Sequence, residues 1–405
     1  MLTDCLTGIR PKPRTVKGKP WPGGISFGRG EWSGAFGDIG TDLPLLVGVI
    51  LVSGMGPGRV LLVFGLAQIL SGLVYRMPMP VQPLKVVAVL VMAQGLQGNV
   101  IAGGGLAIGV VMLALTLTGA LDFLARLVPV PVVRGIQCGL GVKLALLAAG
   151  DYVIGHGAPG ILMAFAAVLL LPVMTGRPKI PASLALLALG AAAAWLGGAA
   201  NGAGWQLPPA VQPWSLPSTA DIWAGFILLA LPQIPLSLGN SVLATRELAM
   251  DWFPEARVSA KKIGFTYSLF NIAIAFVGGV PVCHGAGGIA GHYAFGARTG
   301  GSVIVYGGFF ALLGACALLG LGNVLALFPL PILGVILARE GLALMGRVRG
   351  LGHDPAALAT ALLVCVLAVF LANGFLAGMV AGTLFFWACR RMSMPGAALP
   401  ETETE

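Results

Sequence analysis

Charged residues are scarce in this sequence. Asp, Glu, Lys and Arg make up 10% of the 405 residues, against about 25% in an average soluble domain, whereas 57% are hydrophobic. The mean hydropathy of +0.92 agrees with this bias. So few charges cannot cover a surface that faces water on all sides. The composition therefore excludes an ordinary soluble domain and predicts a polytopic protein embedded in a lipid bilayer.

Acidic residues are the scarcer of the two signs. The chain has 24 Lys and Arg against 15 Asp and Glu, a net charge of +9. Positive residues concentrate on the cytoplasmic loops of membrane proteins, and this preference accounts for the excess without a polyanionic partner. We therefore predict that the protein does not bind nucleic acid.

Cysteine and the common catalytic motifs are also lacking. The six cysteines are scattered and form no CxxC pair, which excludes a disulfide framework and a cysteine-based metal site. The sequence has no HExxH, no Walker loop, and no Ser or Cys nucleophile with a base at motif spacing. We predict that the protein is not an enzyme and holds no metal or cofactor.

What the sequence does contain is a series of apolar segments in two groups of seven. A basic cytoplasmic tail without a signal peptide (1–30) precedes the first repeat (31–200), and an extracytoplasmic linker (201–220) precedes the second (221–390) and a C-terminal tail (391–405). Most segments approach the roughly 20 residues that cross a bilayer as a helix. They lie at residues 36–54, 58–75, 80–97, 100–121, 132–152, 159–175, 180–199, 221–244, 262–279, 281–295, 300–320, 324–345, 356–371 and 374–389.

The positions of Lys and Arg predict the orientation. With a cytoplasmic N-terminus and fourteen crossings, 21 of these residues fall on the cytoplasmic side and Arg59 alone falls outside. Only Lys85 and Lys143 lie within apolar segments. A miscounted crossing would reverse every later loop, so this asymmetry predicts that both termini are cytoplasmic.

The sequence 278–291 breaks an apolar region with Pro281, His284 and closely spaced glycines. A break in a membrane helix is tolerated where protein or a water-filled cavity satisfies the backbone, and a helix that restarts just after Pro281 would direct free N–H groups at an anion. A glycine packing face around a kinking proline is the alternative. Residues 79–83 match 280–284 at an offset of 201, and 128–133 match 328–333 at an offset of 200.

This repeat predicts the fold class. Because each half holds an odd number of crossings, the second copy must enter the membrane in the opposite sense. We therefore expect an all-α membrane protein of about 14 transmembrane segments in two inverted seven-helix repeats. Two broken half-helices would meet at the substrate site, as in secondary transporters.

In the first copy, a short extended segment through Pro80, Val81 and Gln82 should lead into a helix that starts near Pro83. Lys85 would then lie one turn inside an apolar run. A lysine at bilayer depth costs about 3 kcal/mol or more and normally faces a cavity or a partner. Snorkelling of Lys85 to the interface is the alternative.

Carboxylates and amides elsewhere are further candidates. Asp38 and Asp42 are four residues apart, on one helical face, and are expected to relay protons or bind Na⁺. A helix cap or a partner for Lys85 is an equally favoured role for them. Gln233, Ser237 and Asn240 form a polar stripe at helical spacing that should line the cavity or pack on other helices. Arg339 and Glu340 are expected to form a local pair at the cytoplasmic end.

Four stretches together resemble one family. Residues 34–41 (GAFGDIGT), 78–85 (PMPVQPLK), 232–241 (PQIPLSLGNS) and 281–288 (PVCHGAGG) resemble signature stretches of the MOT-type molybdate transporters, relatives of the SulP sulfate permeases. The resemblance runs from about residue 31 to the last segment. It implies uptake of a tetrahedral oxyanion by a seven-plus-seven fold with core and gate bundles, similar to that of the uracil permeases. The eighth segment has Asn240 where many SulP-like and nucleobase carriers have a coupling carboxylate.

The expected activity is therefore secondary active import of molybdate, with H⁺ as the coupling ion, across a bacterial inner membrane. Sulfate or tungstate permeation, a nucleobase carrier of the same fold, and an anion channel stay open as alternatives, as does a homodimer. Asp38 and Asp42 are the predicted coupling residues. The predicted substrate site comprises Pro80, Val81, Gln82, Lys85, Gln233, Asn240, Val282, Cys283, His284, Gly285 and Ala286.

Overall fold

The computed structural model describes residues 23–121, 123, 128–175, 181–196, 213–321, 323–371 and 373–392. The predicted tails and the predicted linker lie largely outside these residues. Within them the chain is mostly helical, and its strands, β1 and β2, are three residues long.

The first half of the chain ends several helices at glycines in the left-handed conformation, such as Gly54 and Gly95, which L-residues with a side chain rarely adopt. Its elements are α2 (Arg29–Ala35), α3 (Ile39–Ser53), α4 (Pro57–Tyr75), β1 (Val81–Pro83), α5 (Lys85–Gln94), α6 (Gly98–Thr118), α8 (Val130–Leu147), η1 (Ala148–Val153), η2 (Ile154–His156), α9 (Gly157–Thr175) and α10 (Ala182–Leu196).

The second half begins with a capping box at Ser218 and Asp221, which satisfies free N–H groups at the start of its first helix. Its elements are α11 (Thr219–Gly225), η4 (Phe226–Ala230), α12 (Leu231–Leu236), η5 (Ser237–Ala244), α13 (Thr245–Trp252), η6 (Pro254–Ala256), α14 (Ala260–Val277), β2 (Val282–His284), α15 (Ala286–Ala294), α16 (Gly301–Leu318), η7 (Val324–Leu327), α17 (Leu330–Gly346), η8 (Arg347–Leu351), α18 (Pro355–Phe370) and α19 (Gly374–Met392).

Long apolar helices confirm the prediction of a membrane protein. Among the described residues, five helices are long and apolar enough to cross a membrane, or six if the bent pair α2 and α3 is one span. On α4, Leu66, Leu70 and Leu73 share one face and are about half exposed, as side chains that face lipid would be. Gln68 and Ser71 on the same helix are fully buried, so polar side chains point inward.

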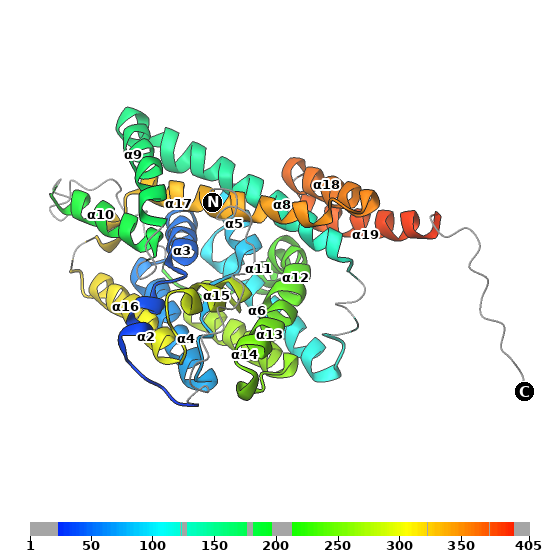
Figure 1. The fold of residues 1–405 in the computed structure, drawn as a ribbon, viewed down its shortest axis with the longest axis horizontal. Helices are drawn as coiled ribbons and strands as arrows, with labels where there is room; N and C mark the ends of the chain where they lie inside the picture. The colour runs from blue at the N-terminus through cyan, green and yellow to red at the C-terminus, as the bar shows by residue number, and fades with distance from the viewer. Residues whose placement is uncertain are drawn as a thin grey trace, which may run out of the picture.

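The helices pack into two bundles. The larger bundle contains α2–α6 and α11–α16, and the pairs α4 with α16 and α6 with α14 form its most extensive contacts. The smaller bundle contains α8–α10 and α17–α19, and lies along the top of the view in Figure 1. Contacts of α3 with α17 and of α5 with α8 connect the two. Each bundle thus combines segments from both halves of the chain.

The elements that follow the two matched motifs begin at the same offsets as the motifs. Strands β1 and β2 begin at Val81 and Val282, 201 residues apart, and α5 and α15 begin at Lys85 and Ala286. Helices α8 and α17 each follow an N-cap proline, Pro129 and Pro329. The sequence repeat therefore corresponds to a repeat of local structure.

Two local predictions need correction. The first predicted segment, 36–54, contains the single helix α3, and the separate helix α2 precedes it, bent by 41° across a short break. Asp38 lies in that break, at the N-cap of α3, so it does not share a continuous helical face with Asp42. The helix after Pro281 starts at Ala286, because Val282–His284 first pair as a strand. The first copy agrees with its prediction, because the extended strand β1 leads into α5, which starts at Lys85, two residues after Pro83.

Candidate functional site

Two broken helices meet at the centre of the larger bundle. Strands β1 and β2 pair antiparallel, with Val81 opposite His284 and Gln82 opposite Cys283. The Leu84 amide also donates to the Pro281 carbonyl at 2.9 Å. Each strand leads directly into a short helix, α5 or α15. The N-termini of both half-helices, which carry free N–H groups and partial positive charge, are therefore held near one another.

Side-chain amides satisfy the outer edges of both strands. Gln68 on α4 donates to the Val81 carbonyl at 2.7 Å and accepts from the Val81 amide at 2.9 Å. In the second half Asn271 on α14 does the same for Val282, at 2.7 and 2.9 Å. Unpaired backbone groups are costly in a membrane, and two strands alone leave their outer edges unpaired. Neither Gln68 nor Asn271 was predicted as a site residue, although an amide side chain inside an apolar segment was a usable signal.

Gln233 has a similar structural role. Its side-chain oxygen accepts from the Val86 amide in the first turn of α5 at 3.0 Å, and its NH₂ group donates to Ser237 at 3.2 Å. Ser237 in turn is 2.8 Å from the Tyr267 hydroxyl. One free amide of the α5 N-terminus is thus capped by the eighth predicted segment, and the polar stripe predicted there contributes to packing.

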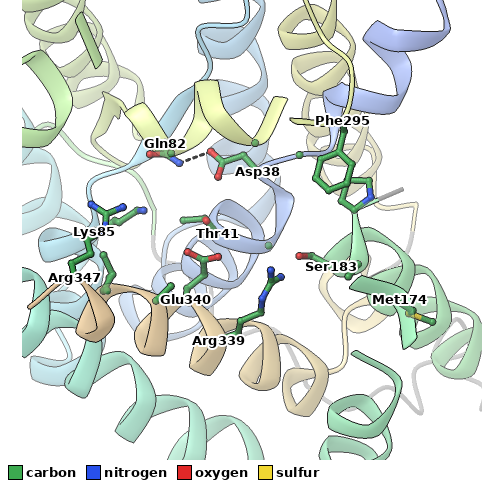
Figure 2. Close-up of a pocket in the computed structure, with 18 residues that line it drawn as sticks. Asp38, Thr41, Gln82, Lys85, Met174, Ser183, Phe295, Arg339, Glu340 and Arg347 are labelled. Carbon is green, nitrogen blue, oxygen red and sulfur yellow. Dashed lines mark hydrogen bonds between the residues drawn. The ribbon is translucent and has the colours of Figure 1, made fainter. Parts of the chain in front are cut away.

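A cavity of about 280 Å³ lies between the two bundles, beside these half-helices (Figure 2). The larger bundle supplies one wall, which includes the first turns of α3, α5 and α15. The smaller bundle supplies the other wall from α17, η8, the end of α9 and the start of α10. The lining residues are Gly37, Asp38, Gly40, Thr41, Gln82, Lys85, Met174, Pro181, Ala182, Ser183, Gly287, Gly291, Phe295, Arg339, Glu340, Ala343, Leu344 and Arg347.

Lys85 and Asp38 both reach this cavity, but they are not paired with each other. The Gln82 amide donates to an Asp38 carboxylate oxygen, as Figure 2 shows. Lys85 is half-buried and forms no hydrogen bond or ion pair with the residues that the structure describes. A direct Lys85–Asp38 ion pair, one of the roles that the sequence left open for Asp38, therefore does not form between these residues, and the ammonium group is available to a ligand in the cavity.

Glycines allow the walls of the site to approach closely. A Cβ at Gly285 would collide with the Gln82 side chain, so the absence of a side chain there leaves room for the Gln82 amide. A Cβ at Gly291 would lie 2.7 Å from the Gly37 carbonyl oxygen, which brings the break before α3 against α15. These contacts explain two of the closely spaced glycines in residues 278–291.

Asp42 and His284 point away from the cavity. Asp42 is fully buried and accepts a hydrogen bond from the Tyr306 hydroxyl at 3.0 Å. His284 is also fully buried, with its Nε2 2.9 Å from the Thr266 hydroxyl and its ring 5.1 Å from the Tyr75 ring. A ligand-facing His284 does not fit this geometry.

The other predicted substrate residues do not line the cavity, and most of them belong to elements beside it. Among the described residues, the cavity wall does not include Pro80, Val81, Gln233, Asn240, Val282, Cys283, Gly285 or Ala286. Most of them form the paired strands and the start of α15. Gly287, one residue further on, does line the cavity.

The smaller bundle contributes charges that the sequence analysis did not assign to a site. Arg339, Glu340 and Arg347 line the cavity, and no Arg339–Glu340 ion pair within 4.0 Å forms between these described residues. The prediction of a local Arg339–Glu340 pair is therefore wrong. Both residues line the cavity separately, as Arg347 does. Together with Lys85 and Asp38 they place three cationic groups against two carboxylates, which leaves one positive unit in excess.

The fold has clear counterparts among solved structures. It is similar to the transmembrane domain of a cyanobacterial bicarbonate transporter, BicA, with a TM-score of 0.62 and 18% identity, covering 89% of this chain and 98% of that one. It is also similar to SLC26A9, with a TM-score of 0.64 and 12% identity, covering 89% of this chain and 65% of that one. These two structures show that the chain has the fold of a helical transmembrane domain.

Sequence relatives specify the family. The family described as "Molybdate transporter of MFS superfamily" matches residues 30–144 and 225–344. Molybdate transporter 2 of Arabidopsis thaliana is 32% identical over 361 residues, covering 78% of this chain and 77% of its own. Molybdate transporter 1 of the same plant is 29% identical over 409 residues, covering 88% and 87%. The chain belongs to this molybdate transporter family, whose members are transporters and not enzymes.

Proposed function

We propose that this protein imports molybdate by secondary active transport with alternating access. The observation that carries the proposal is the cavity between the bundles, which Lys85 and the N-terminal turns of α5 and α15 line from the same side. The names of the curated relatives supply the substrate. Sulfate and tungstate have the same tetrahedral shape and charge and are the alternative substrates.

The charges in the cavity suit a dianion. An oxyanion that leaves water must find donors fixed by the protein, or its lost hydration is not replaced. Two half-helix N-termini supply roughly half a positive charge each, which leaves a dianion about one unit short. Lys85 supplies that unit, and Arg339 and Arg347 face the same space from the other bundle.

The proposal includes fourteen crossings in two inverted repeats, and the packing of the helices supports the two-fold relation between the repeats. Under the predicted repeat, α4 corresponds to α14 and α6 to α16. The observed packing of α4 on α16 and of α6 on α14 is the exchange that a two-fold relation would produce. In this proposal the larger bundle is the core and carries the substrate. The smaller bundle is the gate, and residues 31–200 and 221–390 are the two repeats.

Orientation and setting follow from the same proposal. Both termini are cytoplasmic and residues 201–220 are extracytoplasmic, as the distribution of Lys and Arg indicates. The membrane is a bacterial inner membrane, H⁺ is the coupling ion, and a homodimer is compatible with the fold.

Transport by proteoliposomes tests this function. Purified protein should concentrate molybdate against its gradient when a pH gradient is imposed, and should do so better than sulfate and much better than uracil. An Na⁺ gradient in place of the pH gradient identifies the alternative coupling ion. Flux that only dissipates the anion gradient would show a channel, and preferred uracil uptake would show a nucleobase carrier.

A further inference from the structure

Glu340 is an unexpected residue for a cavity that binds anions. It lies on α17 of the smaller bundle, and Lys85, Arg339 and Arg347 line the same cavity around it (Figure 2). Within the described residues Glu340 forms no hydrogen bond and no ion pair closer than 4.0 Å. Its carboxylate is therefore not held in a hydrogen bond or ion pair that stabilises the fold.

The other cavity carboxylate differs in this respect. Asp38 is buried, lies on the larger bundle and accepts a hydrogen bond from Gln82. Glu340 is half-buried and lies on the opposite wall, in the second half of α17. Like charges repel strongly in a cavity of low dielectric constant, so an ionised Glu340 must oppose the binding of any anion.

The cations explain why such a residue is useful. Without Glu340, the empty cavity would hold Lys85, Arg339 and Arg347 against Asp38 alone. Concentrated positive charge costs free energy in the empty site, and it also holds a dianion so tightly that release becomes slow. A carrier must release its substrate and then change conformation with an empty site.

We propose that Glu340 is the resident counter-anion of the oxyanion site. In the empty protein its carboxylate balances the cations from both bundles, and the arriving oxyanion takes over that balance. Glu340 therefore lowers the affinity for substrate and speeds its release. This inference rests on the proposed oxyanion site, but it does not depend on which oxyanion is the physiological one.

The test compares molybdate binding and transport by Glu340→Gln and by the wild type. The substitution keeps the side-chain volume and removes the charge. We expect binding measured by calorimetry to become roughly tenfold tighter, which corresponds to about 1.4 kcal/mol. In proteoliposomes KM should fall, and the maximal rate should fall with it because release is slower. Glu340→Asp, which keeps the charge, should bind with nearly wild-type affinity.

A control removes the same charge elsewhere. Glu255 is exposed in η6, outside the cavity, and Glu255→Gln should leave affinity and rate unchanged. If Glu340→Gln does not fold, Glu340→Ala provides the same charge test. Unchanged or weaker molybdate binding by the charge-removing variant would overturn the inference while leaving wild-type transport intact. A wild type that binds sulfate but not molybdate would instead refute the proposed substrate, and the comparison would then be made with sulfate.

Discussion

Among single residues, the two lysines that lie within apolar segments of the sequence differ in their surroundings in the structure. Lys85 reaches the cavity at the first turn of α5, whereas Lys143 lies on α8 with its ammonium 5.8 Å from the Phe375 ring centre. The ammonium group of Lys143 thus contacts an aromatic ring, whereas that of Lys85 has no aromatic, hydrogen-bond or ion-pair partner among the described residues. This difference makes Lys143 a matched control for Lys85.

Lys85→Gln should weaken molybdate binding and leave expression intact. Loss of one buried charge-assisted contact commonly costs about 1.5–3 kcal/mol, or roughly 10- to 150-fold in affinity. Calorimetry on the purified variant measures this loss, and Lys143→Gln should bind like the wild type. Equal affinities for Lys85→Gln and the wild type would show that Lys85 only snorkels to the interface.

The two predicted coupling carboxylates should behave differently. Asp38 lines the cavity and Asp42 is hydrogen-bonded to Tyr306 away from it. We therefore expect Asp38→Asn to lose pH-driven accumulation of molybdate while still exchanging bound substrate. Asp42→Asn should retain accumulation. Accumulation that survives in Asp38→Asn would remove this carboxylate from the coupling step.

At the scale of elements, the site depends on how two three-residue strands are held in a helical membrane protein. Their pairing satisfies only the facing edges, and Gln68 and Asn271 complete the outer ones. The half-helices α5 and α15 therefore start from an anchored position. A rigid start fixes the direction of the free N–H groups that the proposed oxyanion needs.

Gln68→Leu should destabilise the protein and weaken its substrate site. The substitution leaves the Val81 N–H and C=O unpaired, and each such group costs about 1–3 kcal/mol. We expect the apparent melting temperature in detergent to fall by roughly 5–10 °C. Asn271→Leu should have a similar effect, whereas Gln94→Leu, at the exposed end of α5, should not. A melting temperature as high as that of the wild type would show that water replaces the amide.

At the scale of the whole molecule, the cavity lies between bundles that each draw on both halves of the chain. One wall carries Lys85 and Asp38, and the other carries Glu340 and two arginines. A relative movement of the bundles would therefore change the distance between opposite charges at the substrate. This placement connects the charges of the cavity with the proposed alternating access.

The predicted topology can be measured on the same scale. Ser215 and Ser259 are both exposed, and the fourteen-crossing arrangement places Ser215 outside and Ser259 inside. Single cysteines introduced on a Cys-free background should react with an impermeant maleimide at position 215 but not at position 259 in sealed right-side-out vesicles. Labelling after permeabilisation controls for reactivity. The reverse pattern would refute the topology.

The class of protein and the location of the broken segments could be predicted from the amino-acid sequence. Composition requires a bilayer, and proline with glycine inside an apolar region requires a break that the rest of the protein must satisfy. These features are local, so the paired motifs, the role of Gln82 in the site region and the cavity position of Lys85 were predictable. The family resemblance could also be recognised, because each of its motifs is a short continuous stretch of sequence: residues 34–41, 78–85, 232–241 and 281–288.

Which side chains face the cavity depends on how the strands and bundles pack in three dimensions. Successive residues of a strand point to opposite sides, so the register of β1 on β2 separates His284 from Gln82, and no local pattern fixes that register. The break at Asp38 likewise turns Asp38 toward Gln82 while Asp42 points to Tyr306. Glu340 and Arg347 meet Lys85 across more than 250 residues of sequence, because the packing of two bundles, and not the spacing along the chain, brings them together.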